Sequence, residues 1–192
     1  MQEFNKSYWS TRYRKNTTGW DIGFASTPLV AYFLQLKNKD LKILIPGAGN
    51  AYEAEWLWKR GFKNLHVLDI SEKPLKNLKM RIPDIPDSQL ICGDFFEHQS
   101  SYDLIVEQTF FCALNPSLRK EYERKMRSLL SENGKLIGLM FDAPLNTEHP
   151  PFGGCKEEYQ NLFKNWKKAT FEACYNSIIP RQGRELFVIL KP

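Results

Sequence analysis

Short apolar runs alternate with amphipathic stretches along the whole chain. The apolar runs have the length of β-strands and lie at residues 42–46, 65–69, 89–92, 102–107, 135–141, 169–175 and 185–191. Helical periodicity lies between most of them, in the stretch that ends at Gly61, in the stretch that Ser71 opens, and at residues 116–130 and 156–166. Because parallel strands need crossover connections that are usually helical, this alternation predicts an α/β fold with a mostly parallel sheet. The last two runs, joined by Pro180–Gly183, predict a terminal hairpin at the edge of the sheet.

The first apolar run ends in the turn Pro46–Asn50 and leads into a helical pattern. Gly47 and Gly49 let such a turn adopt unusual backbone dihedrals and leave space for a ligand against the backbone. The next strand ends in Asp69, 22 residues after Gly47, where a carboxylate would bind ribose hydroxyls. Together these features predict a nucleoside-cofactor site. Taken alone, the glycines could serve only a tight strand-to-helix turn, and an NAD or FAD site is an alternative, with Ala51 at the third motif position.

The composition predicts one α/β domain over residues 1–192. A chain of 192 residues that is 42% hydrophobic and 14% aromatic can bury one core, but a second independent core is not expected. The net charge of +5 is modest, and the 27 Lys and Arg residues alternate with the 22 Asp and Glu residues. This pattern indicates a solvated surface rather than dedicated nucleic-acid binding.

The spacing of cysteine and histidine matches neither a metal site nor a disulfide framework. The four cysteines are far apart and the three histidines share no spacing, so we expect reduced thiols and no bound metal. The amino terminus has no apolar targeting segment, and no apolar run approaches the ~20 residues of a membrane span. We therefore expect a cytoplasmic, unexported protein without membrane contact, and a monomer.

Seven short motifs follow one another over nearly the whole chain. They are Thr18–Asp21 with Thr27–Leu29, Pro46–Gly49, Leu68–Glu72, Gly93–Phe96, Tyr102–Ile105, Phe111–Pro116 and Pro150–Phe152. In this order they resemble the thiopurine S-methyltransferase superfamily of class I S-adenosyl-L-methionine (SAM)-dependent methyltransferases, most closely its halide/thiol methyltransferase branch. The resemblance implies a Rossmann-like sheet of seven strands, mostly parallel with an antiparallel last strand, and helices on both faces. It also implies SAM as the cofactor and S-adenosyl-L-homocysteine (SAH) as its product.

Five residues match positions that bind the cofactor in this superfamily. Gly47 and Gly49 would approach the methionine part, Asp69 would bond the ribose hydroxyls, and Asp94 with Phe95 would bracket the adenine. Asp69 could alternatively cap the helix that follows, but Ser71 is better placed for that cap. Glu53 stays unassigned, because the helix dipole favours a carboxylate in a first helical turn without any ligand.

The resemblance also places an N-terminal segment, residues 1–35, over the cofactor as a lid. Trp9, Tyr13 and Trp20 match the aromatic set of that segment. Their ring faces could attract the sulfonium cation by roughly 0.5–2 kcal/mol. Since Trp9 and Tyr13 are four residues apart, one helical face could instead simply press both rings into the core.

The activity that the resemblance implies is methyl transfer to a small soft nucleophile: a thiol, thiopurine, bisulfide or halide. An apolar pocket suits a soft anion, because loss of hydration makes the anion more reactive. A thiol is already partly ionised at neutral pH, so we expect no obligatory catalytic base. The candidate pocket residues are Gln108, Phe110, Phe111, Phe141 and Phe152. Phe141 and Gln108 each replace a tyrosine of the halide/thiol pattern. These two departures concern the identity of the methyl acceptor and leave the cofactor assignment unchanged.

Two other classes of function stay open. A methyltransferase that acts on another small molecule, a nucleic acid or a protein would share the cofactor motifs, and binding to nucleic acid should weaken steeply with salt. A non-catalytic nucleotide-binding module would keep Gly47, Gly49 and Asp69 and form no acceptor pocket. Turnover, rather than cofactor binding, separates this module from an enzyme.

Overall fold

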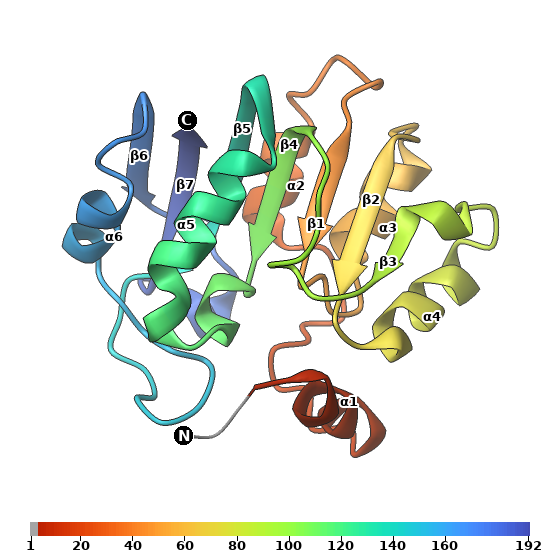
Figure 1. Ribbon diagram of the computed structural model, residues 1–192, viewed down its shortest axis with the longest axis horizontal. Helices are drawn as coiled ribbons and strands as arrows, with labels where there is room; N and C mark the ends of the chain where they lie inside the picture. The colour runs from red at the N-terminus through yellow and green to blue at the C-terminus, as the bar shows by residue number, and fades with distance from the viewer. Residues whose placement is uncertain (1–3) are drawn as a thin grey trace. The chain divides into compact units, whose positions relative to one another are not determined.

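The structure is a computed structural model that describes residues 4–192. In this part of the chain seven strands form a mixed sheet with the order β3-β2-β1-β4-β5-β7-β6 (Figure 1). The strands are β1 (Ile43–Pro46), β2 (Leu65–Asp69), β3 (Leu90–Cys92), β4 (Tyr102–Gln108), β5 (Leu130–Phe141), β6 (Lys168–Ala173) and β7 (Glu185–Lys191). The pairs β1–β2, β2–β3 and β4–β5 are parallel, whereas β7 is antiparallel to both β5 and β6. The predicted α/β fold with an antiparallel last strand is confirmed.

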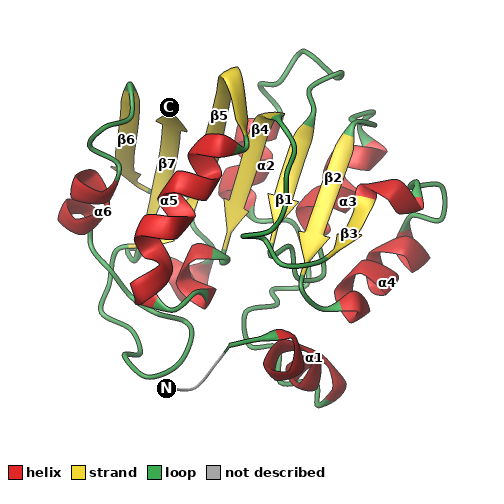
Figure 2. Cartoon of the chain, viewed as in Figure 1, coloured by secondary structure: helices red, strands yellow, loops and turns green. Residues whose placement is uncertain are grey.

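Helices separate most of the strands along the chain (Figure 2). The α-helices are α1 (Lys6–Arg14), α2 (Thr27–Phe33), α3 (Tyr52–Lys59), α4 (Glu72–Arg81), α5 (Arg119–Ser128) and α6 (Lys156–Leu162). Short 3-10 helices lie at Asp87–Gln89, Phe111–Ala113, Pro116–Leu118 and Ile179–Arg181. None of the helices within residues 4–192 combines the length and the apolar character that a membrane crossing needs.

The chain forms two compact units, Met1–His98 and Gln99–Pro192. The first contains β1 to β3 with α1 to α4, and the second contains β4 to β7 with α5 and α6. The interpretation of residues 1–192 as a single domain stays a prediction.

In the first unit, the carboxyl ends of β1 and β2 lie at the same edge of the strands. β1 is buried along its whole length, as is typical of an apolar parallel strand covered on both faces. Pro46 pairs with Leu68, so the glycine turn after β1 and the carboxylate of Asp69 at the end of β2 are neighbours. Gly61 follows the end of α3 with a φ of 89°, the left-handed conformation expected of a glycine that stops a helix.

In the second unit, α5 and α6 pack against β5 and β6 and against each other, and Figure 1 shows α5 in front of β5 and β7. Glu107, near the end of β4, lies opposite Gly138 of β5. The helix predicted at residues 156–166 ends earlier, at Leu162.

The boundary between α5 and β5 differs from the sequence prediction. The helix predicted at residues 116–130 is a 3-10 helix followed by α5, which ends at Ser128. β5 already begins at Leu130, because the predicted turn is an irregularity within the strand rather than a connection before it. Gly134 makes this irregularity possible, since a Cβ atom there would lie 2.7 Å from the carbonyl oxygen of Tyr102.

Candidate cofactor and acceptor sites

The turn between β1 and α3 has an alternating left-handed backbone. Gly47, Gly49 and Ala51 have φ angles of 55°, 55° and 54°. A residue with a Cβ pays roughly 1–2 kcal/mol for this conformation, so Ala51 is a strained position and the two glycines are not. The turn leads directly into α3, whose first amides receive no side-chain cap from the N-cap residue. A helix start of this kind attracts negatively charged groups.

Asp69 joins this turn to the start of α4. Its Oδ2 accepts a hydrogen bond from the Gly49 amide at 3.2 Å, and its Oδ1 accepts one from the Ser71 amide at 2.8 Å. The side chain is only 6% exposed. Burial raises the pKa of the Asp69 carboxyl to about 6, although the two backbone hydrogen bonds favour its ionised form.

Ser71 occupies the N-cap position of α4, but its side chain makes no capping bond. Its hydroxyl instead lies 3.1 Å from the hydroxyl of Ser10 on α1. The expected side-chain cap by Ser71 is therefore wrong, because a tertiary partner competes for the hydroxyl. The Asp69 carboxylate binds the Ser71 amide and so contributes to the local turn as well.

Three aromatic rings of the N-terminal segment lie together beside Gly49. The Trp20 ring is 5.4 Å from the Trp9 ring and 5.7 Å from the Tyr13 ring, both in edge-on geometry. A Cβ atom at Gly49 would lie 3.5 Å from Nε1 of Trp20 and 3.6 Å from the Tyr13 hydroxyl. Burial and the nearby Asp69 carboxylate raise the pKa of Tyr13, which stays a neutral phenol. The structure thus brings together the predicted aromatic set, Gly49 and Asp69.

Polar contacts fix the N-terminal segment to the glycine turn. The Asn50 side chain donates to Oδ2 of Asp21, and its oxygen accepts a hydrogen bond from Asn77 of α4 at 2.9 Å. The Tyr52 hydroxyl donates to the same Asp21 oxygen at 3.4 Å. Sequence reasoning missed this role of Asp21 and Asn50, although Asp21 belongs to the first motif and Asn50 follows Gly49 directly.

Glu53, left unassigned from the sequence, is also buried beneath the N-terminal segment. Its Oε1 accepts a hydrogen bond from the Ser26 amide at 2.8 Å, just before α2. Only 5% of its surface is exposed. Glu53 therefore connects α3 to the chain that precedes α2.

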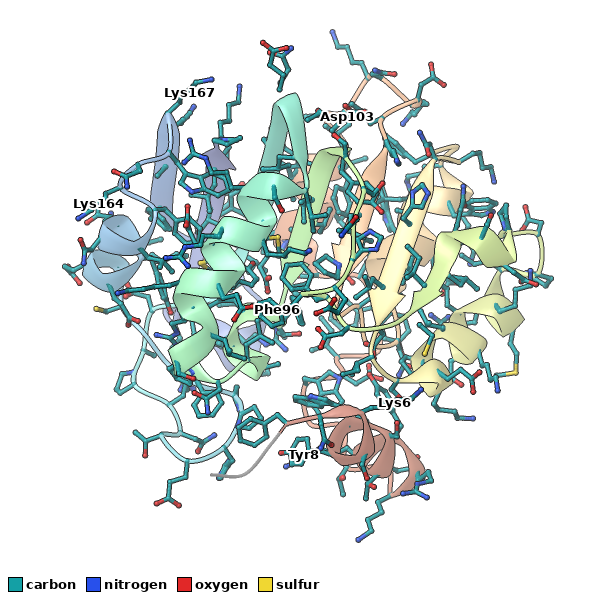
Figure 3. The ribbon with its side chains drawn as sticks, in the orientation of Figure 1. Lys6, Tyr8, Phe96, Asp103, Lys164 and Lys167 are labelled. Atoms are coloured by element: carbon teal, nitrogen blue, oxygen red, sulfur yellow. The ribbon has the colours of Figure 1, made fainter. Side chains whose placement is uncertain are left out.

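The predicted adenine residues follow β3. The Gly93 amide donates to the carbonyl oxygen of Asp69 at 3.1 Å, which places this loop beside the end of β2. Asp94 is exposed and accepts a hydrogen bond from the amide of Phe96 at 2.8 Å, whereas Phe95 is buried. Figure 3 labels Phe96, whose ring lies 5.2 Å from that of Phe95.

Tyr8 and Lys6, also labelled in Figure 3, lie on α1 with Trp9 and Tyr13. The Tyr8 ring is 5.0 Å from the Trp9 ring. The indole of Trp9 donates to the carbonyl oxygen of Phe4 at 2.9 Å. These contacts hold the Trp9 ring in place on α1.

The residues of the first unit fit a nucleoside cofactor. A carboxylate has about four acceptor positions, and the Asp69 carboxylate uses two of them for backbone amides. The missing side chain at Gly49 leaves space beside the Tyr13 and Trp20 rings that a Cβ would fill. These two features provide hydrogen-bond acceptors for hydroxyls and an open approach to the backbone.

The five predicted acceptor residues all belong to the second unit. Gln108 ends β4, and its buried Oε1 has no hydrogen-bond partner among residues 4–192. Phe110 is half-buried, 6.1 Å from the Tyr122 ring. Phe111 is buried, with its ring 4.9 Å from Tyr122 and 5.5 Å from Tyr159.

Phe141 ends β5, and Phe152 lies in the loop that follows it. The carbonyl oxygen of Phe141, at the end of β5, accepts a hydrogen bond from Tyr159 at 2.7 Å. The amide of Phe152 donates to the carbonyl oxygen of Cys112 at 2.7 Å, which joins the loop after β5 to the 3-10 helix after β4. Phe152 is buried and Phe141 half-buried.

Glu107 is a buried carboxylate to which the sequence analysis gave no role. Its Oε1 accepts hydrogen bonds from the amides of Phe110 at 2.7 Å and Phe111 at 2.9 Å, and its Oε2 accepts one from the Tyr122 hydroxyl at 2.6 Å. Burial raises the pKa of Glu107 to about 7, against the effect of these three bonds. The signal in the sequence was an acid that directly follows the apolar run Leu104–Val106.

Metal ligands are not grouped in the described part of the chain. Within residues 4–192 no set of three or more His, Cys, Asp and Glu side chains could hold a metal ion.

The fold is that of class I methyltransferases, and the family match shows that the chain is a SAM-dependent methyltransferase. More narrowly, the family model for thiopurine S-methyltransferase (TPMT) matches residues 4–188, and the chain belongs to this family. It is 29% identical over 170 residues to a probable thiol methyltransferase 2 of Arabidopsis thaliana, covering 84% of this chain and 74% of that protein. It is 28% identical over 185 residues to thiocyanate methyltransferase 1 of Brassica oleracea, covering 92% and 81% of the two chains.

A solved structure agrees with this assignment at the level of the fold. The 1,6-didemethyltoxoflavin-N1-methyltransferase of Burkholderia thailandensis, crystallised with bound 1,6-didemethyltoxoflavin and SAH, superposes with a TM-score of 0.75. The superposition covers 96% of this chain and 85% of that one, at 14% identity. The predicted SAM cofactor and methyltransferase activity are confirmed by the family to which the chain belongs.

Proposed function

We propose that this enzyme transfers the methyl group of SAM to a small soft nucleophile, such as a thiol, thiopurine, bisulfide or halide. The observation that carries this proposal is the chemistry of the predicted acceptor residues in the second unit: four phenylalanines and one neutral carboxamide, Gln108. The names of the thiol and thiocyanate methyltransferases to which the chain is similar support the same acceptor class.

The proposal assigns the first unit to the cofactor. Asp69 accepts hydrogen bonds from the ribose hydroxyls, Gly47 and Gly49 leave the backbone open to the methionine part, and Asp94 and Phe95 flank the adenine. The N-terminal segment, residues 1–35, acts as a lid over the cofactor, and its rings of Trp9, Tyr13 and Trp20 cover the site. Bound SAM supplies an electrophilic methyl group on a sulfonium.

Catalysis then consists of positioning and desolvation. Holding a nucleophile in line with the methyl carbon can supply about 7–11 kcal/mol. A soft anion among aromatic rings loses hydration and gains reactivity. Glu107 is not offered as a base, because both of its carboxylate oxygens already accept hydrogen bonds from the protein.

A panel of methyl acceptors tests the proposed function. Purified protein is incubated with SAM and iodide, bisulfide, thiocyanate, an aromatic thiol or a thiopurine, and the methylated product and SAH are quantified. We expect turnover of at least one of these nucleophiles. Activity only with an oxygen or amine acceptor, or SAH binding without turnover of any acceptor, would contradict the soft-nucleophile assignment.

The variant Gln108→Ala tests whether Gln108 belongs to the binding site of the methyl acceptor. The unpartnered carboxamide oxygen of Gln108 can accept a hydrogen bond from the N–H or S–H group of a thiopurine or thiol, so its loss should raise the KM for such an acceptor roughly tenfold, the factor expected for one hydrogen bond. The Kd for SAH should not change. An equal rise in both constants would place Gln108 on the cofactor side instead.

We further propose a monomeric protein that works in the cytoplasm on a small-molecule acceptor. Four widely spaced cysteines, free thiols in the structure, support a reducing compartment. Light scattering after size-exclusion chromatography tests the monomer, and a mass of two chains would contradict it.

A further inference from the structure

Glu107 is the most deeply buried acid of the second unit, and its bonds converge on one short segment. The carboxylate is fully buried, with Oε1 bonded to the amides of Phe110 and Phe111. Its other oxygen is held by the Tyr122 hydroxyl of α5, 15 residues further along the chain. Removing water from a carboxylate is costly, and an apolar side chain would fill the same space without this cost. The three donors that bind the Glu107 carboxylate therefore indicate that it has a role other than packing.

The segment that Glu107 binds contains a strained residue. Thr109 has a φ of 58°, which is a genuine outlier for a β-branched side chain and costs of order 1–3 kcal/mol. The amides bonded to Glu107 belong to the two residues that follow Thr109 directly. The carboxylate therefore holds the chain in a conformation that Thr109 would not adopt by itself.

The neighbouring strand leaves space for the backbone and Cβ of Glu107. Gly138 of β5 lies opposite Glu107, and a Cβ atom there would collide with the Cβ and the carbonyl oxygen of Glu107. A glycine inside a strand weakens the strand and often marks a close approach of two backbones. The site around Glu107 is thus built from β4, β5 and α5 together.

Gln108 and Phe110 flank the strained Thr109. Gln108 carries a buried side-chain oxygen with no hydrogen-bond partner among residues 4–192. Phe110 is half-buried, whereas Phe111 is clamped between Tyr122 and Tyr159. An unpartnered oxygen and a partly exposed ring on a strained turn are the groups available to a ligand.

We propose that Glu107 is the positioning residue of the acceptor segment 108–111. Its carboxylate, oriented by Tyr122, holds the left-handed turn at Thr109 and thereby aims the Gln108 carboxamide and the Phe110 ring at the methyl acceptor. Glu107 acts through these residues and does not touch the reacting atoms. The inference rests on the proposed acceptor role of Gln108 and Phe110.

Two substitutions at position 107 test the proposal. Glu107→Ala removes the acceptor of both amides, and we expect the KM for the best acceptor of the panel to rise about tenfold or more. The Kd for SAH should stay within about twofold, because no cofactor residue is touched. Glu107→Gln keeps an oxygen for both amides and an NH₂ group for the Tyr122 hydroxyl, so its acceptor KM should stay near that of the wild type.

Hydrogen exchange gives a readout that does not depend on the acceptor. The amides of Phe110 and Phe111 should exchange about tenfold faster or more in Glu107→Ala, and at wild-type rates in Glu107→Gln. If Glu107→Ala does not fold, Tyr122→Phe releases only the second carboxylate oxygen, and it should raise the acceptor KM by about threefold with the SAH Kd unchanged.

Each result decides the question. The proposal is overturned if folded Glu107→Ala keeps the wild-type acceptor KM, if KM and the SAH Kd rise together, or if Glu107→Gln is as defective as Glu107→Ala. A wild-type protein that methylates none of the soft nucleophiles contradicts the proposed function alone. The exchange rates of the two amides then still decide whether Glu107 holds the turn.

Discussion

The amide of Gly49 donates a hydrogen bond to Oδ2 of Asp69 at 3.2 Å, which joins the turn after β1 to the end of β2. The same carboxylate accepts the Ser71 amide at the start of α4. One buried acid therefore joins the turn after β1 to the start of α4, at the proposed nucleoside site. Substitution of Asp69 should affect cofactor binding and, to a smaller extent, local structure.

Asp69→Asn should weaken SAH binding at least tenfold while the fold survives. Asparagine keeps one oxygen acceptor, which serves one of the two backbone amides, whereas its NH₂ group can accept neither from the other amide nor from a ribose hydroxyl. Each lost hydrogen bond to a charged group is worth about 1.5–3 kcal/mol. Calorimetric titration with SAH measures the affinity, and thermal unfolding is the control. An unchanged Kd would refute the ribose assignment.

Affinity for SAH should fall as the pH is lowered below about 6. Burial raises the pKa of Asp69 to about 6 without cofactor, and ribose hydroxyls are bound best by the ionised carboxylate. Above this pKa the affinity should be constant, and below it the affinity should fall by up to about tenfold per pH unit. Asp69→Asn should show no such slope between pH 5 and 8. A wild-type affinity independent of pH over this range would contradict the assignment.

Gly49→Ala should lower both stability and SAH affinity, whereas Gly61→Ala should lower stability alone. Both glycines have a positive φ, 55° and 89°, so each alanine costs roughly 1–2 kcal/mol of backbone strain. Only at Gly49 does the new methyl group fill space beside Trp20 and Tyr13, since nothing lies within 4 Å of a Cβ at Gly61. Equal SAH affinities in the two variants would remove Gly49 from the cofactor site.

Gly138→Ala should destabilise the protein by about 1–3 kcal/mol. The added Cβ would collide with backbone atoms of Glu107, and overpacking of a well-filled core costs about this amount. Gly93→Ala is the matched control, because a Cβ there has nothing within 4 Å and no positive φ to strain. Denaturant unfolding of the two variants measures the difference. A Gly138→Ala variant as stable as Gly93→Ala would show that β4 and β5 are not in this close contact.

The unfolding free energy of Glu107→Gln, relative to that of the wild type, should increase with pH. Burial raises the pKa of Glu107 from 4.5 to about 7, so the folded protein binds more protons than the unfolded chain between these values. The wild type thus loses stability as the pH rises through this window, by an amount on the order of 3 kcal/mol at most. Unfolding free energies of both proteins at pH 5 and 8 test this sign. A difference that shrinks toward pH 8 would contradict the raised pKa.

Local features of the chain were sufficient to predict most of the fold, and they also led to the hypothesis of the cofactor residues. The alternation of apolar runs and helical periodicity predicted the strands β1 to β7, because burial patterns repeat within a few residues. Gly47, Gly49 and Asp69 were proposed as cofactor residues for the same reason, since turn dihedrals and the end of a strand are local properties. The irregularity at Gly134 was missed, because only its distance to Tyr102 distinguishes it from an ordinary turn.

Side-chain partners, in contrast, were decided by tertiary structure alone. Ser71 looked like a helix cap, yet its hydroxyl meets Ser10, which lies 61 residues away in the chain. Glu107 looked unremarkable until Tyr122 and the amides of Phe110 and Phe111 were seen to converge on it. Periodicity determines which side of an element is buried, but a hydrogen bond requires a particular atom from a distant residue, and only the folded chain specifies that atom.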